Sequence, residues 1–208
     1  MRRLLLLASA MVFLDLTFFT AIAPLLPTYV HDLHLSTAQA GILSAAYAAG
    51  TLVAALPAGY VASRFGPQRT VIIGLVTLGL VSVAFGFLKS AYPLDAARFI
   101  QGAAGALIWS GALTWLINSY PEDQRGSVIG TALGTAVAGS LLGPVLGALA
   151  ASIGTEVVFS AVLVVALALA WGATRIPDTV VRENQPIGEV LRCLVDRPLV
   201  EEIGRAHV

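Results

Sequence analysis

The sequence predicts an all-α membrane protein that crosses the bilayer six times, and three observations support that prediction. Of the 208 residues, 57% are hydrophobic and only 12% are charged, which is about half the charged fraction of a soluble domain. The mean hydropathy is +0.85, so too few polar groups are present to cover a water-facing surface. Six apolar runs are long enough, at roughly 20 residues each, to cross about 30 Å of hydrocarbon.

The six runs are expected to be helices, because an open sheet cannot satisfy its backbone hydrogen bonds in lipid. Their Ala, Leu and Gly content is typical of closely packed membrane helices and not of alternating barrel strands. We expect the six-helix bundle to occupy 1–175. The expected spans are 4–28, 39–63, 70–88, 94–118, 127–152 and 157–175.

The arginines predict the orientation of the bundle. Basic residues of multi-pass proteins gather on the cytoplasmic side. On a six-pass trace the connectors of one side hold most of the basic residues, whereas those of the other side hold only Lys89. The protein is therefore predicted to lie in the cell membrane with both termini on the cytoplasmic side. An even number of spans also requires the two termini to share a side. The arginines on that side are Arg2, Arg3, Arg64, Arg69, Arg125, Arg175, Arg182, Arg192 and Arg197.

Few residues suit catalysis or metal binding. Cys193 is the only cysteine, so neither an intramolecular disulfide nor a thiolate cluster can form. The histidines, at positions 31, 34 and 207, fall outside the apolar runs. The 12 basic and 12 acidic residues balance, and no basic stripe for nucleic acid is present. We therefore expect no enzyme activity, no metal, no cofactor and no nucleic-acid partner.

The sequence becomes polar after Arg175. Residues 176–208 contain three prolines and many charges, and are expected to form a cytoplasmic linker with a short amphipathic helix near 187–195. The last seven residues, 202–208, resemble the translation of a sequencing-adapter oligonucleotide. We interpret them as a sequence artefact and expect the natural protein to be longer; the alternative is an ordinary polar tail.

The connector after the second run reads GYVASRFGPQR. Gly66 can adopt a positive φ in a tight turn, while Arg64 and Arg69 can hold the helix ends at the headgroup level. Ser63 is a candidate cap for a helix N-terminus. A basic stop-transfer loop would explain the two arginines, but not Gly59 and Gly66 at this spacing.

The fourth run contains Arg98 and Gln101, one helical turn apart, in the segment RFIQGAAGA. Gly102, Gly105 and Ala106 form one small-residue face that permits close contact with another helix. An arginine this far inside a span is costly unless it faces a cavity or a carboxylate. The alternative is an interfacial arginine whose side chain reaches outward to the headgroups.

The fifth run carries Gly139, Gly143 and Gly147 at four-residue spacing, which predicts a groove for a neighbouring helix. Pro144 has no N–H for the carbonyl of Ser140, so the helix is expected to bend or loosen there. A bent, glycine-lined helix can act as a pivot between two gating states. The alternative is ordinary small-residue packing.

The first run contains Asp15, the only acidic residue well inside any run, followed by Thr20 and two prolines. Removal from water favours the neutral acid over the carboxylate. A proton and a cationic amine can then compete for Asp15, which is a physical basis for exchange. The alternative is a packing aspartate hydrogen-bonded to a neighbour. Tyr47, Trp109 and Trp115 are candidate aromatic contacts for a cation, or core residues.

These four segments together resemble the major facilitator superfamily over 1–176, and within it the proton-coupled drug and amine antiporters. The first connector is similar to the family's G-x-L-A-D-R-x-G-R-R, with Ser63 where the family has an aspartate. That aspartate belongs to a charge relay with the other half, so the departure puts the relay in doubt. The fourth run resembles R-x-x-Q-G-x-G-x-A, and the fifth resembles the antiporter motif G-x-x-x-G-P-x-x-G.

The resemblance implies two inverted three-helix repeats, which form half of a twelve-helix transporter whose C-terminal six-helix half is missing. It implies proton-coupled efflux of a small, cationic or amphipathic molecule by alternating access, with lipid, substrate and protons as partners. Asp15, Arg98 and Gln101 are then the expected coupling residues. The expected gating and packing residues are Gly59, Ser63, Arg64, Gly66, Arg69, Gly139, Gly143, Pro144 and Gly147. Two alternatives remain, a half-size homodimeric carrier and a non-transporting or inactive membrane fragment.

Overall fold

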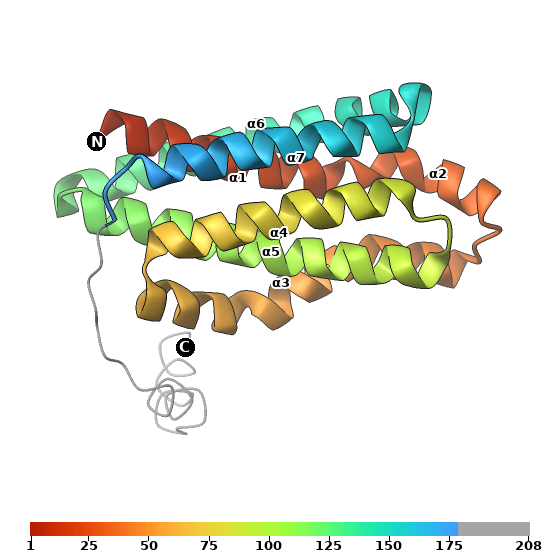
Figure 1. Ribbon diagram of the computed structural model, residues 1–208, viewed down its shortest axis with the longest axis horizontal. Helices are drawn as coiled ribbons and strands as arrows, with labels where there is room; N and C mark the ends of the chain where they lie inside the picture. The colour runs from red at the N-terminus through yellow and green to blue at the C-terminus, as the bar shows by residue number, and fades with distance from the viewer. Residues whose placement is uncertain (179–208) are drawn as a thin grey trace, which may run out of the picture.

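The computed structural model describes residues 1–178, and this part of the chain is a bundle of seven helices without a strand (Figure 1). Six stretches of helix are long and apolar enough to cross a membrane, since α1 and α2 together form the first. The predicted all-α, six-span fold class is therefore confirmed. The amphipathic helix expected near 187–195 lies outside the described residues. The helices are α1 (Arg2–Thr20), α2 (Ile22–Asp32), α3 (Thr37–Phe65), α4 (Pro67–Phe87), α5 (Ala91–Ser119), α6 (Glu122–Ile153) and α7 (Thr155–Thr174).

The helix pairing shows the two inverted repeats. The first residue and the end of α7 lie at the same end of the bundle (Figure 1). The most extensive helix contacts include α3 with α5 and α1 with α6. A two-fold axis in the membrane plane that exchanges spans one to three with spans four to six converts the first of these contacts into the second. Such an axis also reverses the direction of each span, as six antiparallel passes require.

The repeats also share a turn. Gly66 joins α3 to α4 with φ 93° and ψ 152°, and Gly154 joins α6 to α7 with φ 106° and ψ 133°. Each glycine ends one helix and begins the next, and few residues other than glycine adopt such angles. Gly66 thus has the positive φ expected from the sequence. Gly154 is its equivalent in the second repeat, and the junction of α6 with α7 lies at the opposite end of the bundle from the junction of α3 with α4 (Figure 1).

The first span is interrupted, although the sequence predicts one helix over 4–28. α1 ends at Thr20, and α2 begins after the single residue Ala21. Pro24 lies four residues after Thr20 and has no N–H to donate to its carbonyl, so the helical hydrogen-bond ladder is broken at this level. α6, in contrast, runs through Pro144 without interruption.

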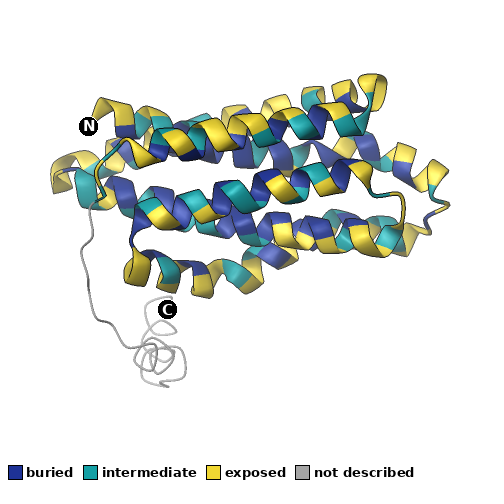
Figure 2. Cartoon of the chain, viewed as in Figure 1, coloured by how far each residue is buried: buried dark blue, intermediate teal, exposed yellow. Residues whose placement is uncertain are grey.

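The outer surface of the bundle is apolar, as lipid requires. Buried residues line the inward faces of the helices, and exposed ones cover the outside (Figure 2). The exposed fraction of Leu52 on α3 is 78% and that of Leu141 on α6 is 73%. These two helices are also the spans with the smallest buried share. A soluble protein would not leave such long apolar faces uncovered.

Glycines allow the backbones of paired helices to approach each other. A Cβ on Gly102 of α5 would collide with the carbonyl oxygen of Tyr47 on α3. α6 packs on the first span in the same way, because a Cβ on Gly147 would collide with the carbonyl oxygen of Ala21 and lie 2.6 Å from Pro24 Cγ. The predicted small-residue groove of the fifth span thus holds the backbone of the first.

Gly147→Ala is therefore expected to destabilise the bundle by about 1–3 kcal/mol, since the added methyl group forces the two helices apart. The matched control is Gly134→Ala on the same helix, where a Cβ meets no atom within 4 Å. Thermal unfolding in detergent, followed by circular dichroism, compares the two variants. Equal midpoints for both would show that the close approach contributes nothing to stability.

Candidate coupling site

The carboxylate of Asp15 lies at the meeting point of three spans. It is only 2% exposed on α1. Its Oδ1 accepts a hydrogen bond from the hydroxyl of Tyr47 on α3, and its Oδ2 accepts one from Nε1 of Trp109 on α5 at 2.8 Å. Asp15 thus faces the interior of the bundle and not the lipid. Its hydrogen bonds to Tyr47 and Trp109 fit the alternative of an aspartate that packs against neighbouring helices. Asp15 is nevertheless an acidic group inside a span, and such groups are candidates for proton exchange.

Gly105 provides the space for this carboxylate. A Cβ on Gly105 would lie 2.6 Å from Asp15 Oδ1 and 2.7 Å from the hydroxyl oxygen of Tyr47. Real Cβ atoms do not approach oxygen so closely, so the glycine is needed at this position. The small-residue face of the fourth span therefore accommodates the polar group as well as the neighbouring backbone.

Arg98 is buried beside this group, with an exposed fraction of 1%. Its guanidinium donates to the backbone carbonyls of the first span, with Nη2 3.1 Å from Phe19 O and Nη1 3.4 Å from Phe18 O. Its Cζ lies 4.8 Å from the centre of the Tyr47 ring, a cation–π distance. The alternative of an arginine that reaches outward to the headgroups is therefore wrong.

Gln101 links Arg98 to the third span. Its Oε1 accepts from Arg98 Nη1 at 3.3 Å, and its Nε2 donates to Ser82 Oγ on α4 at 3.1 Å. Ser82 in turn donates to the carbonyl of Leu78. Because the amide is fully buried and bonded on both sides, it orients the guanidinium. The structure thus brings the three predicted coupling residues into one connected region.

Asp15 and Arg98 form no ion pair in the described part of the chain. Tyr47 connects them, because its hydroxyl donates to Asp15 while its ring lies under the guanidinium. Sequence reasoning named Tyr47 and Trp109 as candidate contacts for a cation or as core residues, and it missed their hydrogen bonds to Asp15. These hydrogen bonds could have been anticipated, because the hydroxyl of a buried tyrosine and the indole N–H of a buried tryptophan each need a hydrogen-bond partner.

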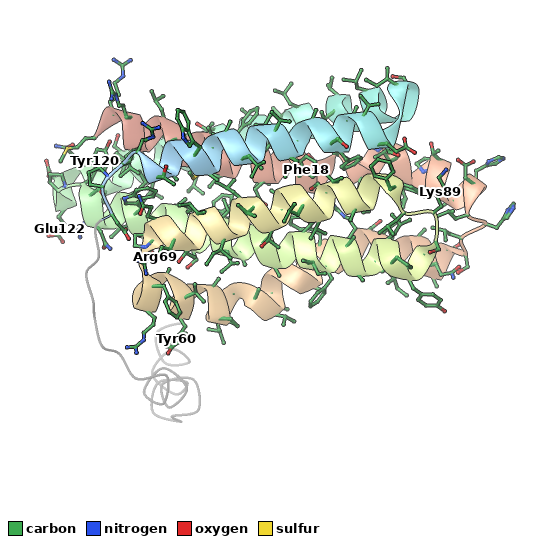
Figure 3. All side chains as sticks on the ribbon, viewed as in Figure 1. Phe18, Tyr60, Arg69, Lys89, Tyr120 and Glu122 are labelled. Atoms are coloured by element: carbon green, nitrogen blue, oxygen red, sulfur yellow. The ribbon has the colours of Figure 1, made fainter. Side chains whose placement is uncertain are left out.

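The connector residues lie at the end of the bundle that holds the N-terminus. Arg69 is labelled there (Figure 3), and Arg64 and Arg69 are both exposed. The Ser63 hydroxyl donates to Tyr60 O at 2.9 Å inside the last turn of α3, so its expected role as a helix N-cap is wrong. The chain begins α4 with Pro67 instead. Gly59 is exposed, and a Cβ there meets no atom within 4 Å.

A pocket of about 540 Å³ opens at the opposite end of the bundle, near Lys89 (Figure 3). Tyr29, Asp32 and Glu156 contribute to its lining. The hydroxyl of Tyr29 is buried without a hydrogen-bond partner among the described residues. Within residues 1–178, no group of three His, Cys, Asp or Glu side chains is placed to hold a metal ion.

Comparisons with known proteins agree with this architecture. The family model described as Major Facilitator Superfamily matches residues 6–203. The MFS-type transporter ppzB of Metarhizium majus is 31% identical over 125 residues, which are 57% of this chain and 27% of that protein. The MFS-type transporter Rv1250 of Mycobacterium tuberculosis is 32% identical over 111 residues, 53% of this chain and 19% of that protein. The chain thus spans less than a third of either relative.

A solved structure has the same fold. The proton:xylose symporter XylE, bound to 6-bromo-6-deoxy-D-glucose, superposes with a TM-score of 0.76 at 16% identity. The match covers 85% of this chain and 45% of the symporter. At this identity the likeness concerns the fold alone. The relatives and the family point to a transporter and not to an enzyme.

Proposed function

Because the chain belongs to the major facilitator superfamily, and corresponds to the N-terminal six-helix half of its transporters, we propose a specific form of secondary transport. The transporter exchanges protons for a small cationic or amphipathic molecule by alternating access. One observation carries this proposal. Asp15, the only acidic residue well inside a span, is buried at the centre of the bundle with hydrogen-bond donors from two other spans.

The geometry supports exchange at a single carboxylate. Once its proton leaves, Asp15 is stabilised by the donors of Tyr47 and Trp109, and Arg98 lies on the other side of the Tyr47 ring. A proton or an organic cation neutralises the same charge, so the occupancy of one excludes the other. Binding and release from opposite sides then convert this competition into antiport.

The proposal includes a second six-helix half that packs against this one. The apolar faces of α3 and α6 are the least buried in the bundle. Gly59 on α3 and Gly134 on α6 face open space, although glycines in membrane helices usually mark close contact with another helix. The exposed Arg64 and Arg69, at the end of the bundle that holds the N-terminus, support a cytoplasmic location of that end in a protein of the cell membrane.

Proton flux in membrane vesicles tests the proposal. Vesicles that contain this chain together with its second half are given an acidic lumen, and a lipophilic ammonium dye is added outside. We expect the dye, but not xylose, to cause proton release from the lumen, because only a cation competes for Asp15. Vesicles without the protein provide the background rate.

Two results would contradict the proposal. Proton uptake into the lumen caused by external xylose, with no response to the dye, would indicate a sugar symporter, and the absence of any coupled flux would indicate another driving ion or an inactive fragment. Exchange by the 208-residue chain alone, with dimers trapped by crosslinking, would indicate the half-size homodimeric carrier.

A further inference from the structure

Two prolines, Pro24 of the first span and Pro144 of α6, lie where these two spans cross. Pro144 has no N–H for the carbonyl of Ser140, and Pro24 has none for the carbonyl of Thr20. The two prolines lie at the same crossing, because Gly147 of α6 packs against Ala21 and Pro24. Each span therefore has one carbonyl without its helical donor at the same crossing.

The hydroxyl of Thr20 replaces the donor that Pro144 lacks. Thr20 Oγ1 lies 3.0 Å from the carbonyl oxygen of Ser140, although the two residues are 120 positions apart. A carbonyl that is removed from water and lacks a partner costs up to about 1–3 kcal/mol, so a hydroxyl that reaches this half-buried carbonyl from another span stabilises the crossing. This hydrogen bond gives the Ser140 carbonyl a donor at the level where α6 continues through Pro144 as one helix.

Gly143 gives the hydroxyl access to this carbonyl. A Cβ on Gly143 would overlap Thr20 Oγ1 and lie 2.5 Å from the carbonyl oxygen of Thr17. The Gly-Pro pair thus has two functions, since Pro144 removes the backbone donor and Gly143 opens the space for its replacement. We call this arrangement the Thr20 clasp; it consists of Thr20, Gly143, Pro144 and the Ser140 carbonyl.

The same hydroxyl has a second acceptor on its own helix. Thr20 Oγ1 also lies 3.0 Å from the carbonyl oxygen of Leu16. A hydroxyl carries one proton and donates to one acceptor at a time. When the helices separate, Thr20 can therefore donate to Leu16 instead, and only the Ser140 carbonyl loses a partner. Opening the Thr20 clasp is less costly than breaking a hydrogen bond that leaves both groups unpaired.

We propose that Thr20 is a positioning residue that holds the first and fifth spans together at the level of Pro24 and Pro144. It releases α6 by transferring its hydrogen bond from Ser140 to Leu16. The inference concerns the movement of α6 against the first span, and it holds whichever substrate or ion the transporter carries. Asp15, about one turn and a half before Thr20 on the same helix, would follow that movement.

Thr17 provides a control within the same crossing. Its hydroxyl also has two acceptors, Phe13 O at 2.8 Å and Gly139 O at 3.0 Å. The carbonyl of Gly139, however, can receive the backbone N–H of Gly143, because residue 143 is not a proline. Loss of the Thr17 hydroxyl therefore leaves no carbonyl on α6 without a donor.

A double-mutant cycle on the purified 208-residue chain in detergent tests the proposal. Thr20→Val keeps the shape of the side chain and removes the hydroxyl, and is expected to lower the unfolding midpoint by about 2–4 °C. In the Pro144→Ala background the same change should have little effect, because an alanine at that position supplies the missing N–H to Ser140. Thr20→Ser should restore the midpoint, and the effect of Thr17→Val should be the same in both backgrounds.

Equal losses from Thr20→Val in the two backgrounds would overturn the proposal, as would a dependence of Thr17→Val on Pro144. A second measurement needs no proline variant. Amide hydrogen exchange along 140–148 should become faster in Thr20→Val and remain unchanged in Thr20→Ser. Unchanged exchange in Thr20→Val would show that the hydroxyl does not hold α6.

Discussion

Asp15→Asn is expected to abolish proton-coupled transport while leaving the bundle folded. Asparagine has nearly the same shape as aspartate, and its carbonyl oxygen can still accept from Tyr47 or Trp109, which donate to Asp15 in this structure. It cannot bind a proton or balance a cation. Substrate-dependent proton release from vesicles should therefore fall to the background rate, while the unfolding midpoint stays close to that of the unchanged chain.

The control for this variant is Asp95→Asn. Asp95 lies in the second turn of α5 and is partly exposed, so its substitution makes the same chemical change away from the candidate site. This variant should retain coupled transport. Undiminished proton flux in Asp15→Asn, or equal losses in both variants, would eliminate Asp15 as the coupling group.

Arg98→Lys is expected to reduce transport by about tenfold or more, although the positive charge is retained. The planar guanidinium donates to Phe18 O, Phe19 O and Gln101 Oε1 while it stacks on Tyr47. A lysine ammonium has no planar fork with which to reproduce this arrangement. The loss of one charged hydrogen bond, about 1.5–3 kcal/mol, corresponds to roughly tenfold or more in a rate that depends on it.

Arg175→Lys is the matched comparison for Arg98. The Arg175 guanidinium also lies over an aromatic ring, with Cζ 4.4 Å from the centre of Trp171, but both residues are exposed. The substitution there should leave transport and stability nearly unchanged, since solvent screens exposed contacts. Equal transport rates in Arg98→Lys and Arg175→Lys would show that the buried guanidinium has no special role.

Most of the fold follows from local sequence signals. Apolar runs of sufficient length predict the spans, because lipid leaves the backbone no alternative to internal hydrogen bonds. The tight turn at Gly66 follows from a glycine between two strongly helical segments. The break at Ala21 is harder to predict, because Pro24 and Pro144 are both inside apolar runs and only Pro24 interrupts the helix. α3 also continues through Pro57 as one helix, so a proline in an apolar run does not by itself show where a span is interrupted.

The candidate site was only partly predictable, because the sequence does not show which residues of distant helices contact each other. Asp15, Arg98 and Gln101 stand out because polar groups are costly within a span. Their partners depend on which faces of three helices meet, and Tyr47 and Trp109 lie 32 and 94 positions from Asp15. Helical periodicity shows which residues share a face, but not which face of another helix lies opposite. The predicted N-cap role of Ser63 was wrong because α3 continues to Phe65 and ends only at the Gly66 turn, so Ser63 lies inside the last turn of α3.

The one-residue turns at Gly66 and Gly154 restrict how the nascent chain can be inserted during synthesis. A linker of one residue is too short for two helices to take up separate positions in the bilayer. We therefore expect α3 with α4, and α6 with α7, each to be integrated as a hairpin. In the orientation proposed above, the Gly66 turn stays on the cytoplasmic, ribosomal side with Arg64 and Arg69. In the same proposed orientation the Gly154 turn is translocated together with Glu156, so the two repeats, despite their common architecture, would be inserted with their turns on opposite sides of the membrane.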